Sequence, residues 1–131
     1  MGSKKALIFD MDGVIVDTIN FHYLGWKNYL KKWNIDLQME QFKNEMFGTP
    51  GHEAIRKLIG GDLSSERVRA HCENVDAEFR RAFDEDREIE PVAGVREFLK
   101  SAKEGGWIIG LGTSAPLENV NSVFRKFGIG G

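Results

Sequence analysis

The segment ALIFDMDG, residues 6–13, runs a short apolar stretch directly into two aspartates and a glycine. The stretch over 5–9 shows no alternation with polar residues, which is typical of a strand buried on both faces of a parallel sheet. Residues 107–111, WIIGL, form a second stretch of the same kind. The two stretches predict an α/β fold with a parallel, helix-covered sheet that resembles a Rossmann core, of which this chain holds two strands.

Between these strands the sequence carries only helical periodicity. In residues 18–33, apolar side chains recur at spacings of three and four, which places them on one helix face. That face consists of Ile19, Tyr23, Trp26, Leu30 and Trp33. The predicted helices cover 18–33, 39–47, 52–59, about 64–83, 95–104 and 116–127.

The segment 20–86 has no strand signal and is predicted to be an all-helical insertion. It divides an α/β core made of residues 1–19 and 87–131. The chain has 131 residues, a net charge of −2 and a single cysteine, Cys72, which we interpret as a small core residue. Because there is no clustered basic face, signal peptide or long apolar run, we expect a soluble cytoplasmic protein without nucleic-acid or membrane partners.

The aspartates Asp10 and Asp12 are predicted to lie beyond the carboxyl end of the first strand, where open parallel sheets bind ligands. Adjacent carboxylates repel unless a cation or a proton intervenes, so the pair is costly as structure alone. One carboxylate can act as a nucleophile towards phosphorus, the other as general acid and base, and both can ligate Mg²⁺. Gly13 allows a tight turn. A strand-end turn with solvated acids stays open as an alternative, whereas a calcium loop is excluded by Val14.

The second strand ends in LGTSAP, residues 111–116, immediately before a predicted helix. Thr113 and Ser114 therefore lie where a hydroxyl, backbone N–H groups and a helix N-terminus can bind an anion. The alternative is that Ser114 only caps the helix. The two roles are compatible if Thr113 binds phosphate and Ser114, or its amide, orders the turn.

The segments FDMDGVIVDT (9–18) and GTSAP (112–116) resemble the haloacid dehalogenase superfamily of phosphohydrolases, in the branch of β-phosphoglucomutase and its phosphatase relatives. The segments HYLGW (22–26) and EPVAGVREFLK (90–100) also match the sequence pattern of this family at the expected positions. The resemblance implies that Asp10 forms an aspartyl phosphate, and that Asp12 protonates the leaving group and then activates water. It further implies that Mg²⁺ binds to the Asp10 carboxylate and the Asp12 backbone carbonyl. It also implies that Thr113 and the following amide bind the phosphoryl group transferred from a small phosphate ester.

The same resemblance makes 20–86 a mobile cap with a hinge at Asp17 and Thr18. His22, beside that hinge, aligns with a residue linked to cap closure in the mutase. The mutase carries an arginine in its cap loop for a second phosphate, and this sequence has Gly51 or His52 at that place. The difference favours a phosphatase over a mutase, with specificity expected in the loop 49–53.

Members of this family continue beyond the point where this sequence ends. They carry a third motif with a lysine and a fourth motif whose acids complete the metal site. We therefore expect the 131-residue chain to be a poor enzyme, and a mutase or an inactive fragment acting as a binding module remain alternatives. A sheet of two strands leaves open edges, through which the chain is expected to self-associate.

Overall fold

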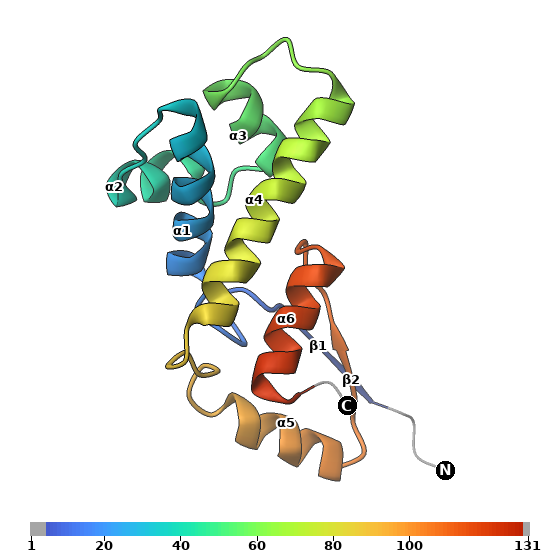
Figure 1. Ribbon diagram of the computed structural model, residues 1–131. Coiled ribbons are helices and arrows are strands. Elements are labelled where there is room, and N and C mark those ends of the chain that lie inside the picture. Colours follow the sequence, from blue (N-terminus) through green and yellow to red (C-terminus); the bar gives the residue numbers. More distant parts are fainter. Residues whose placement is uncertain (1–4, 130–131) are drawn as a thin grey trace. The chain divides into compact units, whose positions relative to one another are not determined.

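The computed structural model of the chain describes residues 5–129 (Figure 1). They form two compact units: an α/β unit, which joins the segment up to Ile19 to the segment from Arg87 onward, and a helical unit, Asn20–Asp86. The outermost parts of the predicted core, residues 1–4 and 130–131, lie outside the described residues. Among the described helices, none is long and apolar enough to cross a membrane.

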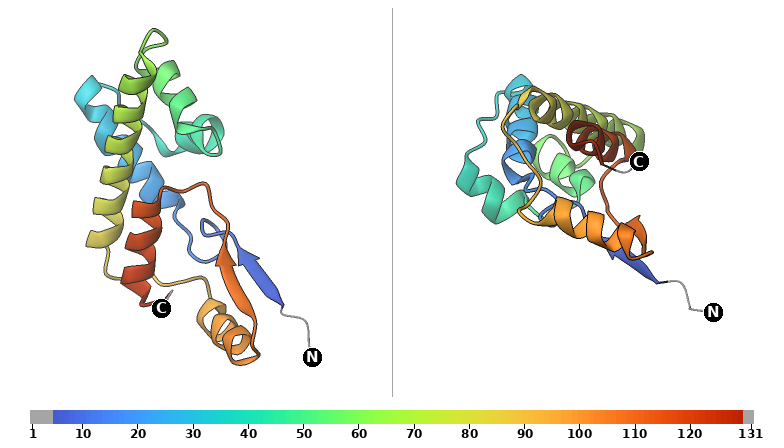
Figure 2. Two further views of the ribbon diagram at one scale, coloured as in Figure 1. Left: turned by 90° about the vertical axis from the view of Figure 1, so that its right-hand side faces the viewer. Right: turned by 90° about the horizontal axis from the view of Figure 1, so that it is seen from below.

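The α/β unit contains two parallel strands, β1 (Ala6–Phe9) and β2 (Ile108–Leu111). Ala6 pairs with Ile108 and Phe9 with Leu111, so the strands run in register side by side (Figure 2). Helix α5 (Val95–Glu104) precedes β2 and helix α6 (Leu117–Phe127) follows it. The predicted α/β fold with a parallel sheet is confirmed.

The prediction that both strands are buried on both faces is wrong for the described residues. On one face, the Phe9 ring meets the Phe98 ring of α5 edge to face, at 5.9 Å between centroids. On the other face, Ile8 is 79% exposed and Ile108 is 54% exposed. The physical reason is that the described helices cover only the face that carries Phe9.

The helical unit follows the predicted order of helices within a few residues. Its elements are α1 (Ile19–Leu30), a 3₁₀ turn (Lys31–Trp33), α2 (Met39–Gln41), a π-helical turn (Phe42–Met46), α3 (Gly51–Leu58) and α4 (Ser65–Glu85). Ser64 caps α4, because its hydroxyl accepts a hydrogen bond from the Arg67 N–H at 3.2 Å. A serine hydroxyl at this position satisfies one of the N–H groups that the first turn of a helix leaves unpaired.

The buried face of α1 differs from the face expected from sequence. Its buried residues are Phe21, Gly25, Tyr29 and Leu30, while Trp33 is 46% exposed. A Cβ atom on Gly25 would lie only 3.0 Å from the backbone nitrogen of Phe79 on α4. The two helices therefore approach closely at this glycine, and Phe21 and Tyr29, four residues before and after it, are also buried.

The core of the helical unit also contains a cluster formed by Tyr29, Ile55, Val68 and Val75. Cys72 packs against this cluster, as its interpretation as a small core residue expects. Burial raises the pKa of the Cys72 thiol, and the neighbouring acids Asp76 and Glu73 act in the same direction. A raised pKa keeps the thiol protonated and disfavours a nucleophilic role.

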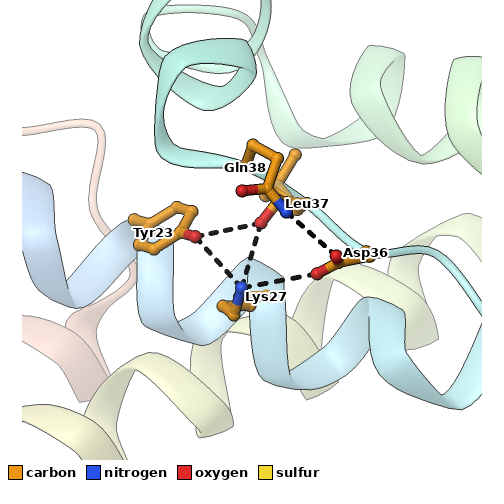
Figure 3. Close-up of polar contacts among 5 residues, drawn as sticks. All are labelled: Tyr23, Lys27, Asp36, Leu37 and Gln38. Atoms are coloured by element: carbon orange, nitrogen blue, oxygen red, sulfur yellow. Dashed lines mark hydrogen bonds and ion pairs between the residues drawn. The ribbon is translucent and has the colours of Figure 1, made fainter.

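A polar cluster fastens the loop after the 3₁₀ turn to α1 (Figure 3). The Lys27 ammonium donates to the Tyr23 hydroxyl at 3.2 Å, to the Leu37 carbonyl at 3.3 Å and to Asp36 at 3.4 Å. The Tyr23 hydroxyl itself donates to the Leu37 carbonyl at 2.9 Å, and the Gln38 amide donates to Asp36. The hydrogen bond to Tyr23, and secondarily Asp36, raises the pKa of Lys27 above its ordinary value of 10.5.

This raised pKa predicts a loss of stability at alkaline pH. A group with a higher pKa in the folded state stabilises the fold fully below its unfolded pKa, and this contribution is lost as pH rises through the folded pKa. From about pH 9 to about pH 11, the melting temperature of the wild-type chain should fall more than that of Lys27→Met. Parallel pH dependences of the two chains, measured by circular dichroism, would contradict the prediction.

Candidate functional site

The segment after β1 folds into a closed turn over residues 11–16, which contains Asp12. The Met11 carbonyl accepts hydrogen bonds from the N–H groups of Ile15 at 2.9 Å and Val16 at 3.2 Å. The Gly13 N–H donates to the Val16 carbonyl at 2.8 Å, and Gly13 has φ +80°. A positive φ favours glycine, so Gly13 has the backbone role that the sequence suggests.

Asp10 lies at the carboxyl end of β1 with its side chain exposed to solvent. One carboxylate oxygen, Oδ1, accepts the N–H of Met11 at 2.7 Å. This hydrogen bond orients the carboxylate. The exposure leaves the group accessible to a substrate or a cation, as a nucleophile or metal ligand requires.

Asp12 is half-buried and is held by a residue that the sequence did not identify as part of the site. The Thr18 hydroxyl donates to Asp12 Oδ1 at 2.5 Å, and Thr18 is only 2% exposed. From sequence, Thr18 was interpreted only as a hinge residue. The pair is joined across a turn and not along a single helix or strand, so neither period predicts it.

The end of β2 lies directly beside the end of β1. The Gly112 N–H donates to the Phe9 carbonyl at 2.8 Å, and Asp10 and Thr113 are the next residues of their respective segments. The Thr113 hydroxyl accepts the Ala115 N–H at 3.1 Å, whereas α6 has no side-chain cap. Thr113 rather than Ser114 therefore orders this turn through its side chain, and the capping alternative for Ser114 is not observed.

The other predicted residues, His22, Gly51 and His52, belong to the helical unit. The His22 ring stacks on the Phe79 ring, with centroids 4.3 Å apart and planes 14° apart. A Cβ atom on Gly51 would contact the Cys72 sulfur at 3.4 Å, while His52 is exposed at the start of α3. The packing against Phe79 fixes the orientation of His22, whereas His52 is free to reach solvent.

The described residues contain no group of three or more His, Cys, Asp or Glu side chains that could hold a metal ion by itself. An open hollow of about 400 Å³ lies in the helical unit, lined by Phe21, Leu24, Asn28, Arg81, Ala82, Glu85 and Asp86. None of the predicted site residues lines it, and its Arg81 donates to Glu78 at 2.6 Å.

Residues 7–131 match the haloacid dehalogenase-like hydrolase family. The chain belongs to this family. The match spans the loop with Asp10 and Asp12, the helical unit, and the strand that leads to Thr113. The resemblance drawn from FDMDGVIVDT and GTSAP is therefore confirmed.

Curated relatives that match nearly the whole of this chain include a β-phosphoglucomutase and a phosphatase. The chain is 29% identical to the beta-phosphoglucomutase of Bacillus subtilis, over 95% of this chain and 56% of the relative. It is 28% identical to the phosphorylated carbohydrates phosphatase of Thermotoga maritima, over 93% of this chain and 55% of the relative. The chain thus spans about half the length of the curated relatives it matches.

A solved structure supports the fold independently. The crystal structure of a haloacid dehalogenase hydrolase of family IA, variant 3, from Entamoeba histolytica has a TM-score of 0.84 to this chain. The sequence identity is 20%, and the match covers 95% of this chain and 55% of that structure. The α/β core with its helical region is therefore the fold of this family.

Proposed function

We propose that this chain carries the two catalytic aspartates of an Mg²⁺-dependent phosphatase of small phosphorylated metabolites. The observation that carries the proposal is the hydrogen bond between the Phe9 carbonyl and the Gly112 N–H. This bond joins the carboxyl ends of the two strands, where the loops of Asp10 and Thr113 begin. An exposed carboxylate beside a hydroxyl and turn amides suits attack on a phosphoryl group. The names of the two curated relatives favour a phosphorylated carbohydrate as substrate.

Asp10 is the proposed nucleophile. Its carboxylate attacks phosphorus and forms an aspartyl phosphate, while the bond from phosphorus to the leaving alkoxide oxygen breaks. Asp12 gives its proton to that oxygen, so the alcohol leaves neutral. A water molecule then attacks phosphorus, Asp12 takes its proton, and inorganic phosphate departs as the Asp10 carboxylate is regenerated.

Thr113 and Ser114 are proposed to bind the phosphoryl group, and Gly13, whose N–H donates to the Val16 carbonyl, is proposed to shape the turn on the other side of it. The Thr113 hydroxyl uses a lone pair to accept the Ala115 N–H, so its own proton remains available to a phosphate oxygen. The turn before α6 also presents backbone N–H groups near a helix N-terminus. Together the hydroxyl and these N–H groups would stabilise the negative charge of the phosphoryl group during its transfer.

The proposed metal is Mg²⁺, held by the Asp10 carboxylate and the Asp12 backbone carbonyl. The donors present fit the ion in kind, because Mg²⁺ prefers oxygen and is commonly bound by one or two carboxylates together with phosphate and water. When bound, Mg²⁺ would neutralise charge on the phosphate and the nucleophile. The Asp12 side chain would remain free for proton transfer.

We propose that the helical unit, 20–86, is the cap over this site and that its loop 49–53 selects the substrate. Gly51 and His52 stand where the mutase has an arginine for a second phosphate. The Cβ position of Gly51 already contacts the Cys72 sulfur at 3.4 Å. This favours a phosphatase of monophosphates, and a requirement for a bisphosphate activator would instead identify a mutase.

The proposal is tested with the 131-residue chain, Mg²⁺ and p-nitrophenyl phosphate. We expect slow hydrolysis that stops when the metal is chelated. In a second experiment, the chain is mixed with acetyl phosphate, quenched in acid and digested for mass spectrometry. A phosphoryl group on Asp10 supports the proposal, whereas a chain that neither hydrolyses the ester nor becomes labelled contradicts it.

Thr18 is expected to position Asp12 for proton transfer. Thr18→Val keeps the shape of the buried side chain but removes the donor to Asp12. The kcat should fall on the order of 10-fold with an unchanged KM, because a hydrogen bond to a charged group is lost. Thr18→Ser should restore the rate. A Thr18→Val chain with wild-type kcat, or a Thr18→Ser chain as slow as Thr18→Val, would contradict this role.

A further inference from the structure

The open hollow of about 400 Å³ in the helical unit is formed by α1 and α4. The start of α1 packs against the end of α4 there, and the ring centroids of Phe21 and Phe83 lie 5.3 Å apart (Figure 1). We call this space the α1–α4 hollow. Its volume falls within the roughly 300–1,000 Å³ of small-molecule sites, and none of the residues assigned to the phosphatase site lines it.

One part of the α1–α4 hollow is apolar. Phe21, Leu24 and Ala82 line it, and Leu24 is 39% exposed although its side chain is large and hydrophobic. Phe21 and Leu24 share a face of α1 because they lie three residues apart. A ligand with an aromatic or hydrocarbon body would cover this part and remove the exposed surface of Leu24 from water, which stabilises the complex.

The rest of the lining is polar and acidic. Asn28 contributes an amide, and Glu85 and Asp86 contribute carboxylates. Arg81 also lines the hollow, but its guanidinium donates to Glu78, one turn earlier in α4, at 2.6 Å. No other cation lines the hollow within the described residues. The charge of Arg81 is therefore shared with a carboxylate outside the hollow, and two further carboxylates remain inside it.

The position of Glu85 in α4 also favours a cation. Glu85 lies in the last turn of the helix, which contains no basic residue. The C-terminal end of a helix carries a partial negative charge that cations stabilise, so a carboxylate there is unfavourable. Arg81 has the i,i+4 spacing for an ion pair with Glu85, yet it pairs with Glu78. Within residues 5–129, no basic side chain pairs with Glu85.

We propose that the α1–α4 hollow binds a small organic ammonium ion with an apolar body. The ammonium group donates to the Glu85 carboxylate at the negative end of α4, in a charge-assisted hydrogen bond. The body of the ion covers Phe21 and Leu24. An anion would meet the two carboxylates of the hollow, and a bare metal ion would leave its apolar part uncovered.

The proposal is tested by amide NMR of the 131-residue chain, with 2-phenylethylammonium chloride as the probe. The amide signals of residues 21–28 and 81–86 should shift and saturate, with a Kd on the order of 1–10 mM for a ligand with so few atoms. Two comparison probes separate the parts of the site. 2-Phenylethanol has the body without the charge, and methylammonium has the charge without the body. Each should bind at least about 10-fold more weakly.

A pair of variants identifies the carboxylate. Glu85→Gln keeps the shape of the side chain and removes its charge, so it should weaken binding of 2-phenylethylammonium at least about 10-fold. The matched control is Asp84→Asn, which removes an exposed carboxylate from the same turn of α4 but outside the lining of the hollow. This control should bind the probe like wild type.

Several outcomes would overturn the proposal. They are hollow signals that stay unchanged at probe concentrations well above the expected Kd, equal binding of 2-phenylethanol, and equal effects of Glu85→Gln and Asp84→Asn. Signals that instead shift with chain concentration in the absence of probe, and no longer do so in Glu85→Gln, would identify a basic side chain of a second copy as the occupant. No phosphate ester is present, so the result is independent of the proposed phosphatase activity.

Discussion

Asp10→Asn should lower the Mg²⁺-dependent hydrolysis of p-nitrophenyl phosphate by about 10³-fold or more. Asparagine has nearly the same shape, and its amide oxygen can still accept the Met11 N–H that now bonds Asp10 at 2.7 Å. The turn after β1 should therefore remain intact. The variant loses the negative charge that the proposed roles of Asp10 as nucleophile and metal ligand require, so the expected loss is chemical rather than structural.

The matched control is Asp62→Asn, which removes one exposed carboxylate from a loop of the helical unit. Its rate should equal that of the wild type, and both variants should show the wild-type circular dichroism spectrum. Acid-quenched Asp10→Asn should also carry no phosphoryl group after incubation with acetyl phosphate. Substantial activity in Asp10→Asn would show that another residue is the nucleophile.

Gly25→Val should destabilise the helical unit by about 2–3 kcal/mol. A Cβ atom at this position would lie 3.0 Å from the Phe79 backbone nitrogen and 3.1 Å from its Cα atom. These are backbone atoms of a neighbouring helix, so the clash is relieved only by moving α1 away from α4. That movement would also separate Phe21 from Phe83, whose ring centroids are 5.3 Å apart.

The control for this substitution is Gly61→Val, because a Cβ atom at Gly61 meets nothing within 4 Å. Its effect should stay within about 0.5 kcal/mol. Urea unfolding followed by far-ultraviolet circular dichroism and by tryptophan fluorescence measures both changes. Gly25→Ala should fall between wild type and Gly25→Val, although alanine by itself favours helix by about 1 kcal/mol over glycine. A Gly25→Val chain as stable as wild type would refute tight packing at this contact.

Most of the local structure could be predicted from the sequence. Short apolar runs and three-to-four spacing identify both strands and the order of the helices, because these periods follow directly from backbone geometry. The left-handed Gly13 after the Asp-x-Asp pair and the Ser64 cap have local causes as well. The carboxyl ends of neighbouring parallel strands lie side by side. The proximity of the Asp10 and Thr113 loops could therefore also be predicted from the sequence.

The buried face of α1 could not be predicted in this way. The apolar pattern correctly selected Leu30, and Trp26 packs against the core cluster, but Trp33 is exposed. The pattern did not select Gly25 and Tyr29, which the core buries. A glycine has no side chain that an apolar pattern could detect. Gly25 matters because the backbone of Phe79, more than fifty residues away in sequence, packs directly against it. Only the packing of α1 against α4 shows that Gly25, the smallest residue of the helix, lies at the contact between them.

The sequence by itself determined which residue types could do phosphoryl chemistry, where the strands end and which family the chain belongs to. Only the tertiary structure showed that Thr18 holds Asp12, that Thr113 orders its own turn, and that Ile8 and Ile108 face solvent. The reason is physical. Periodicity and motif spacing are properties of neighbouring residues, whereas hydrogen-bond partners and burial depend on which distant segments the fold brings together and which surfaces it leaves uncovered.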